Sequence, residues 1–208
     1  MGDAVLKKTF PLHISTESKY CWFKIPKCAS CTISDHLDMH TSRDDTSYPW
    51  GSMQYRSEHM NFFNFAFVRN PYERLVSCWA DKVLNHRVWS HTNRQSDEIH
   101  FMIDNNFSFR EFIFKIVDSF ADTDGHWKPI VDFLPRNYSE FVFIGRLENF
   151  RKDFEYVCDE IGIVNKKYVH VHKTERKHYT RYYDDETRQL VAEKYAEDIE
   201  QFGYKFGD

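Results

Sequence analysis

Residues 21–33 decide the fold, and they read Cys21-Trp22-Phe23-Lys24-Ile25-Pro26-Lys27-Cys28-Ala29-Ser30-Cys31-Thr32-Ile33. The apolar start predicts a buried strand, and the proline followed by small residues predicts a turn into a helix. Backbone N–H groups, two hydroxyls and the Lys27 ammonium would then gather at one helix N-terminus, which favours a phosphate or a sulfate. Because strand–turn–helix units with a lysine are common, this stretch predicts an anion site without naming its ligand.

A second unit of the same kind follows at residues 62–84. Its short apolar and aromatic run, Phe-Phe-Asn-Phe-Ala-Phe-Val over residues 62–68, is typical of a buried strand. Arg69 stands at the turn, and Ser77 lies on the polar side of the helix that follows. The start of that helix is predicted by a cap, a first-position proline and a capping-box acid, which are Asn70, Pro71 and Glu73.

The rest of the chain continues the alternation of helices and strands. We expect helices over residues 109–116 and 147–161, a buried strand over 141–145, and a last helix over 185–202 that stops at Gly203. We expect a short strand or an extended loop over residues 168–172, a loop over residues 41–57, and a loop with a short helix over residues 85–108. Helical crossovers between strands predict an α/β fold, with a central parallel sheet flanked by helices in a single domain spanning residues 1–208. Ligands of such sheets gather at the carboxyl ends of the strands, where Lys27 and Arg69 both fall.

Composition narrows the functional classes. The net charge is −4, with no block of basic residues, which argues against a nucleic-acid surface. Residues 1–14 lack a long apolar run, so we expect no signal peptide or membrane anchor and a cytoplasmic protein. The five cysteines include a lone C-x-x-C at Cys28 and Cys31, without a second pair at the spacing of a zinc site, so no metal is expected.

Two common nucleotide motifs are missing. A Walker sequence needs G-x-x-x-x-G-K-[ST], yet no glycine lies between Gly2 and Gly51. The dinucleotide fingerprint G-x-G-x-x-G is absent as well. An ATPase and a dinucleotide-dependent enzyme are therefore both disfavoured.

Two motifs in the right order resemble those of sulfotransferases that use 3′-phosphoadenosine 5′-phosphosulfate (PAPS). Residues 25–32 (Ile-Pro-Lys-Cys-Ala-Ser-Cys-Thr) resemble the 5′-phosphosulfate loop, and residues 67–77 (Phe-Val-Arg-Asn-Pro-Tyr-Glu-Arg-Leu-Val-Ser) resemble the 3′-phosphate motif. The similarity extends through 126–129 and 143–150 to 182–206, and it covers about residues 20–206. It is strongest to the carbohydrate sulfotransferases that include the chondroitin 4-O enzymes and bacterial relatives, with the uronyl 2-O enzymes more distant. The resemblance implies a P-loop-like nucleotide-binding sulfotransferase fold.

The resemblance also implies roles for particular residues. Lys27 would hold the phosphosulfate and neutralise the bridging oxygen as the sulfuryl group leaves. The 5′-phosphate would be bound by two hydroxyls and the backbone of the loop, which are Ser30, Thr32, Cys28, Ala29 and Cys31. Arg69 and Ser77 would grip the 3′-phosphate, and a late loop with Lys173 and Thr174 would reach the cofactor.

Sulfuryl transfer needs a base that takes the proton of the acceptor hydroxyl. Relatives often place a histidine upstream of the second strand, somewhat further back than any histidine here. His59 is the nearest candidate, and Glu58 and His126 are its rivals.

These observations predict transfer of a sulfuryl group from PAPS, the co-substrate, to a hydroxyl of a carbohydrate, with PAP as the nucleotide product. One alternative is a PAP-binding module without catalytic activity, since the expected upstream histidine is missing and Cys31 stands in the loop. Another is a P-loop-like nucleotide kinase, which the lack of glycine before Lys27 disfavours.

Overall fold

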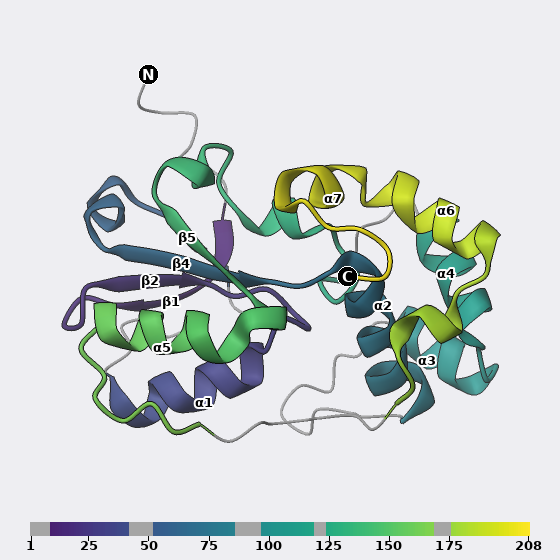
Figure 1. Ribbon diagram of the computed structural model, residues 1–208, viewed down its shortest axis with the longest axis horizontal. Helices are drawn as coiled ribbons and strands as arrows, with labels where there is room; N and C mark the ends of the chain where they lie inside the picture. Colours follow the sequence, from purple (N-terminus) through teal and green to yellow (C-terminus); the bar gives the residue numbers. More distant parts are fainter. Residues whose placement is uncertain (1–8, 42–51, 86–96, 119–123, 169–175) are drawn as a thin grey trace. The chain divides into compact units, whose positions relative to one another are not determined.

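The chain forms two compact units, each built from two separate stretches of sequence. The computed structural model describes residues 9–41, 52–85, 97–118, 124–168 and 176–208. The first unit comprises residues 1–69 and 130–172, and the second comprises residues 70–129 and 173–208 (Figure 1). The chain therefore passes from one unit to the other three times.

The first unit contains a five-stranded sheet in the order β3-β1-β2-β4-β5. Its strands are β1 (Thr9–Ser15), β2 (Tyr20–Phe23), β3 (Ser52–Gln54), β4 (Phe63–Val68) and β5 (Val142–Arg146). β2, β4 and β5 are parallel, whereas β1 pairs antiparallel with both β2 and β3. The predicted α/β fold with a parallel centre is confirmed, and an antiparallel edge is added to it.

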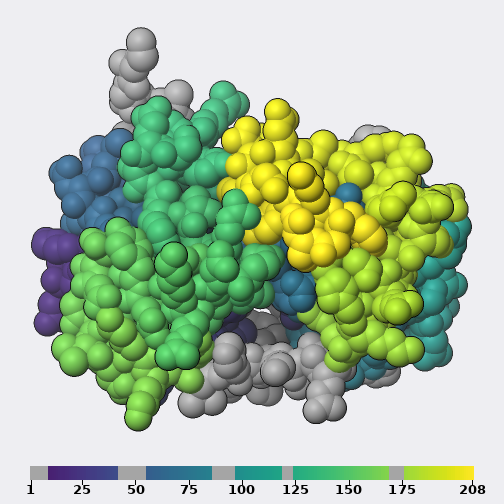
Figure 2. All heavy atoms as spheres, in the orientation of Figure 1, coloured from purple at the N-terminus to yellow at the C-terminus, as the bar shows by residue number. Residues whose placement is uncertain are grey.

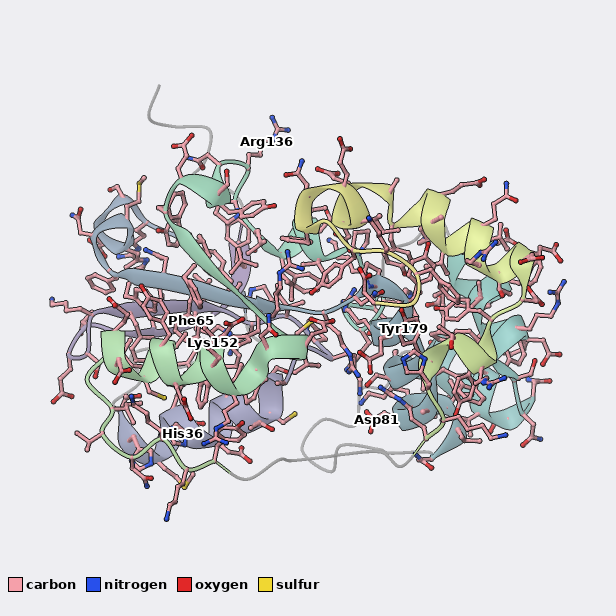
Figure 3. All side chains as sticks on the ribbon, in the orientation of Figure 1. His36, Phe65, Asp81, Arg136, Lys152 and Tyr179 are labelled. Atoms are coloured by element: carbon pink, nitrogen blue, oxygen red, sulfur yellow. The ribbon has the colours of Figure 1, made fainter. Side chains whose placement is uncertain are left out.

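Aromatic side chains fill the face of this sheet that is covered by helices α1 (Ser30–His40) and α5 (Phe150–Glu160) (Figure 1). Phe65 of β4, labelled in Figure 3, stacks on Trp22 of β2, with ring centroids 6.1 Å apart. Phe67 packs against Phe150 at the start of α5, at 5.2 Å. The Phe67 ring also explains Gly145, because a Cβ there would lie 2.6 Å from it. The alternation of aromatic residues along β4 thus attaches α5 to the sheet.

The antiparallel strands β1 and β3 are the main feature that the sequence pattern did not predict. In β1, the apolar residues Phe10, Leu12 and Ile14 alternate with other residues and are buried. His13 and Ser15 on the other face are buried as well, so both faces of this end of the strand are covered. Pro11, however, interrupts the run with a residue that is unusual within sheets. β3 falls at residues 52–54, inside the predicted loop 41–57, of which residues 42–51 lie outside the described part of the chain.

The second unit is helical. Its helices are α2 (Pro71–Trp79), α3 (Asp97–Asp104), α4 (Phe109–Asp118), α6 (Asp185–Lys194) and α7 (Ala196–Phe202). α2 continues into a π-helical turn over Ala80–Leu84, so the helix predicted to reach residue 84 is confirmed. Residues of α2, α3, α4 and α6 share one core with Trp127.

The last predicted helix is interrupted once. Tyr195 leaves helical geometry, at φ −108° and ψ 25°, and separates α6 from α7. Its ring is buried and its hydroxyl donates to the backbone carbonyl of Trp127 (2.5 Å), so a tertiary contact accounts for the break. Gly203 ends α7 in the left-handed region (φ 65°), as expected. Figure 2 shows α6 and α7 as adjoining yellow-green and yellow surfaces.

No helix in the described ranges is long and apolar enough to cross a membrane.

Candidate active site

The turn between β2 and α1 has an unusual backbone. Lys27 (φ 68°) and Ala29 (φ 60°) both lie in the left-handed region, although neither is glycine. The turn stays attached to the sheet, since the Lys24 N–H donates to the carbonyl of Pro11 (2.8 Å). The Cys28 N–H donates to the Ile25 carbonyl (3.4 Å) and closes the turn. The backbone N–H groups of the first turn of helix α1 follow directly, and such a helix N-terminus favours the binding of an anion.

Helix α1 begins at this turn without a side-chain cap. Its N-cap is Ala29, and the first intrahelical bond runs from the Ile33 N–H to the Ala29 carbonyl (3.0 Å). No acidic residue occupies the first turn, so the positive end of the helix dipole is not neutralised there. Ser30 and Thr32 lie in this turn and are buried, whereas Lys27 is half-buried. This is the helix N-terminus that the sequence predicted as an anion site.

Arg69 meets this turn within the first unit. Because β2 and β4 are parallel, with Phe23 paired to Ala66, their carboxyl ends lie at the same sheet edge. Arg69 follows β4, is 8% exposed, and donates from Nη1 to the backbone carbonyl of Lys27 (3.1 Å). The structure therefore brings together Lys27 and Arg69, which the sequence assigned to two different anion motifs.

Ser77 lies in the second unit, on α2, and is 7% exposed. One turn before it on the same helix, Arg74 is fully buried and donates to the carbonyls of Gly125 (3.2 Å) and Lys128 (2.6 Å). Arg74 belongs to the second motif, but neither the motif nor its spacing predicted a role for it. The signal that could have identified it was a second arginine on a helix whose other face is apolar.

Asn70 caps the start of α2, as the sequence predicted, and it also bonds to the backbone of the C-terminal segment. Its Oδ1 accepts from the Tyr72 N–H (3.1 Å), and its Nδ2 donates to the carbonyl of Lys205 (2.8 Å). Tyr179, labelled in Figure 3, accepts from the Gly207 N–H through its hydroxyl (2.6 Å). Burial raises the pKa of Tyr179, so this hydroxyl stays protonated at neutral pH. The residues after α7 are thus held against the first turn of α2.

His59, the predicted base, is buried in a short 3-10 turn over Ser57–Asn61. Its Nδ1 accepts from the Arg56 N–H (3.2 Å), so the neutral ring carries its proton on Nε2. Nε2 lies 3.7 Å from Oε1 of Glu58, the first rival. To take up a proton, His59 would have to release the Arg56 N–H.

His126, the second rival, lies in the second unit. Its Nδ1 is 2.5 Å from Oδ1 of Asp124, which also accepts from the His126 N–H (2.8 Å). Because an ionised carboxylate only accepts, the neutral ring carries its proton on Nδ1 and leaves Nε2 as the basic nitrogen. The side chain is 28% exposed. In this tautomer Nε2 is the nitrogen of the neutral ring that can take up a proton.

Lys173 and Thr174 lie outside the described residues, as do residues 169–172 of the segment predicted as strand or loop. In the ranges that are described, no three His, Cys, Asp or Glu side chains are grouped so that they could hold a metal ion.

Comparison with known proteins agrees with the two motifs. A profile of the sulfotransferase family matches residues 11–205. Carbohydrate sulfotransferase 14 of Danio rerio is 26% identical over 160 residues, which cover 68% of this chain and 42% of that protein. The chain thus spans less than half the length of this relative, and no solved structure matches it. With the profile match covering almost its whole length, the chain belongs to the sulfotransferase family.

Proposed function

We propose that the chain transfers a sulfuryl group from PAPS to a hydroxyl of a carbohydrate. The observation that carries the proposal is the turn at Lys27 and Ala29, which opens helix α1 and is bonded to Arg69 at the carboxyl edge of parallel strands. Family membership supports sulfuryl transfer, and the name of the Danio rerio relative supports a carbohydrate acceptor.

In this proposal the turn holds the 5′ end of the nucleotide. The backbone of residues 28–32 and the hydroxyls of Ser30 and Thr32 bind the 5′-phosphate, with the positive end of the α1 dipole beside them. Arg69 and Ser77 bind the 3′-phosphate, and Lys173 with Thr174 completes the cofactor contacts.

The reaction is a substitution at sulfur. The acceptor oxygen forms a bond to sulfur while the bond from sulfur to the phosphate oxygen of PAP breaks. The Lys27 ammonium stabilises the negative charge that develops on that leaving oxygen. The proton of the acceptor hydroxyl passes to a base of the enzyme.

For the base, His59 remains a candidate and His126 is a rival that its hydrogen bonds favour. The two are distinguished by comparing His59→Ala with His126→Ala. Loss of the base lowers the rate of transfer by about 10²–10⁴-fold, while the dissociation constant for PAP stays within twofold of that of the unmodified chain. If both variants transfer the sulfuryl group at the rate of the unmodified chain, neither histidine is the base, and Glu58 remains.

The function is tested by calorimetry with PAP and by transfer from ³⁵S-labelled PAPS to a panel of sugars and small alcohols. Charge-assisted hydrogen bonds are worth about 1.5–3 kcal/mol each, so Lys27→Ala and Arg69→Ala should each weaken PAP binding at least tenfold. If the unmodified chain does not bind PAP, the proposal fails.

Two alternatives are separated by the same measurements. A PAP-binding module without activity would bind PAP but transfer no label to any acceptor. A nucleotide kinase would bind ATP in preference to PAP. A cytoplasmic location and the absence of a nucleic-acid partner remain predictions.

A further inference from the structure

The hydrogen bond from Arg69 to the carbonyl of Lys27 joins the two anion motifs inside the first unit. Its N–O distance is 3.1 Å, and the Arg69 side chain that makes it is almost fully buried. The acceptor belongs to one of the two left-handed residues of the turn. The Arg69 side chain, which is proposed to bind the 3′-phosphate, therefore also holds the backbone of the turn that is proposed to bind the 5′-phosphosulfate.

Left-handed geometry at a residue other than glycine persists only where surrounding contacts impose it. A flip of the peptide that follows Lys27 would turn the Lys27 carbonyl away from Arg69. It would also break the hydrogen bond from the Cys28 N–H to the Ile25 carbonyl (3.4 Å), which closes the turn that leads into helix α1. The orientation that bonds to Arg69 is the one that shapes the anion site. Arginine suits this position because its planar group carries five N–H donors, so one can hold a carbonyl while others face a phosphate.

We propose that Arg69 is a positioning residue for the 5′-phosphosulfate turn, in addition to binding the 3′-phosphate. This inference rests on the proposed function. A ligand that binds only one conformation of a site shows an apparent affinity reduced by the fraction of molecules in that conformation. Removing Arg69 therefore weakens binding of a 5′-phosphate even when the ligand has no 3′-phosphate.

Coupling between the two sites follows from the same bond. A 3′-phosphate that orders the Arg69 guanidinium also favours the turn that the guanidinium holds. By thermodynamic reciprocity, a filled 5′ site then favours 3′-phosphate binding. If Arg69 bound the 3′-phosphate but did not hold the turn, its removal would weaken only the binding of nucleotides that carry a 3′-phosphate.

The test compares PAP with adenosine 5′-monophosphate (AMP), which lacks the 3′-phosphate, by isothermal titration calorimetry. Arg69→Met keeps an unbranched, flexible side chain that can fill part of the buried space, and it removes every donor. We expect it to weaken AMP at least about fivefold and PAP by more than tenfold. Ser77→Ala should weaken PAP alone and leave AMP within twofold. Arg151→Met, at a highly exposed arginine of α5, is the matched control and should change neither.

The inference is overturned if Arg69→Met weakens PAP while AMP binding stays within twofold of the unmodified chain. Hydrogen exchange of a peptide covering residues 24–33, measured without nucleotide, gives a second readout that needs no ligand. Exchange should be faster in Arg69→Met than in Arg151→Met, and equal exchange contradicts the positioning role. If the unmodified chain does not prefer PAP over AMP, the proposed function fails, while the exchange measurement still decides the role of Arg69.

Discussion

Replacing Ala29 by glycine should make the protein more stable, although a methyl group is lost. Ala29 has φ 60° and ψ 18°, a conformation that costs a residue with a Cβ roughly 1–2 kcal/mol. Glycine removes that cost, but its greater freedom in the unfolded chain offsets about 0.4–1 kcal/mol. The midpoints of these two ranges give a net gain of about 0.8 kcal/mol. For a chain of this length it corresponds to a rise in the melting temperature of about 1–4 °C.

The assay is thermal unfolding followed by circular dichroism, with Ala66→Gly as the control in the same unit. Ala66 is fully buried in β4, where the backbone is extended and glycine brings no relief. Its replacement should cost about 1 kcal/mol or more, from chain entropy and the lost methyl. If Ala29→Gly lowers the melting temperature as Ala66→Gly does, the argument from backbone strain is wrong.

Three further predictions concern the first unit. Gly145→Ala should lower the free energy of unfolding by about 1–3 kcal/mol, because the new Cβ would lie 2.6 Å from the buried ring of Phe67. Thermal unfolding measures this change, and an unchanged melting temperature would contradict the packing. Burial raises the pKa of Cys158 to about 11, so in mass-spectrometric mapping iodoacetamide should label it only after unfolding, whereas half-buried Cys31 is labelled in the folded protein. Burial, with a smaller effect of a neighbouring histidine, lowers the pKa of His36 from its ordinary value of 6.5. As the pH falls below about 6.5, His36 takes up a proton in the unfolded chain but not yet in the folded one, so the free energy of unfolding should fall. His36→Phe should reduce this fall.

The parts of the fold that could be read from the sequence are those with local signals. The aromatic run of residues 62–68 predicts β4, and Asn70 and Pro71 predict the start of α2. β3 could not be read, because a strand of three residues has no period and exists through its pairing with β1. The break at Tyr195 was equally hidden, since it depends on the contact of its hydroxyl with the backbone of Trp127.

The candidate site divides in the same way. The positions of Lys27 and Arg69 followed from where strands end, and the structure confirms that they share one sheet edge. The left-handed backbone of Ala29 could not be predicted, because alanine ordinarily avoids that region. The bond from Arg69 to the Lys27 carbonyl and the orientation of the His126 ring by Asp124 are tertiary contacts, and no spacing in the sequence encodes them.

The order in which the two units are encoded has a consequence for synthesis on the ribosome. β4 pairs with β5, yet residues 70–129 between them belong to the other unit. At about 5–20 residues per second, the partner strand emerges several seconds after β4. During that interval an apolar, aromatic strand has one edge without its final neighbour, the kind of edge on which nascent chains associate with one another. We therefore expect the growing chain to depend on chaperones most strongly between the emergence of β4 and that of β5.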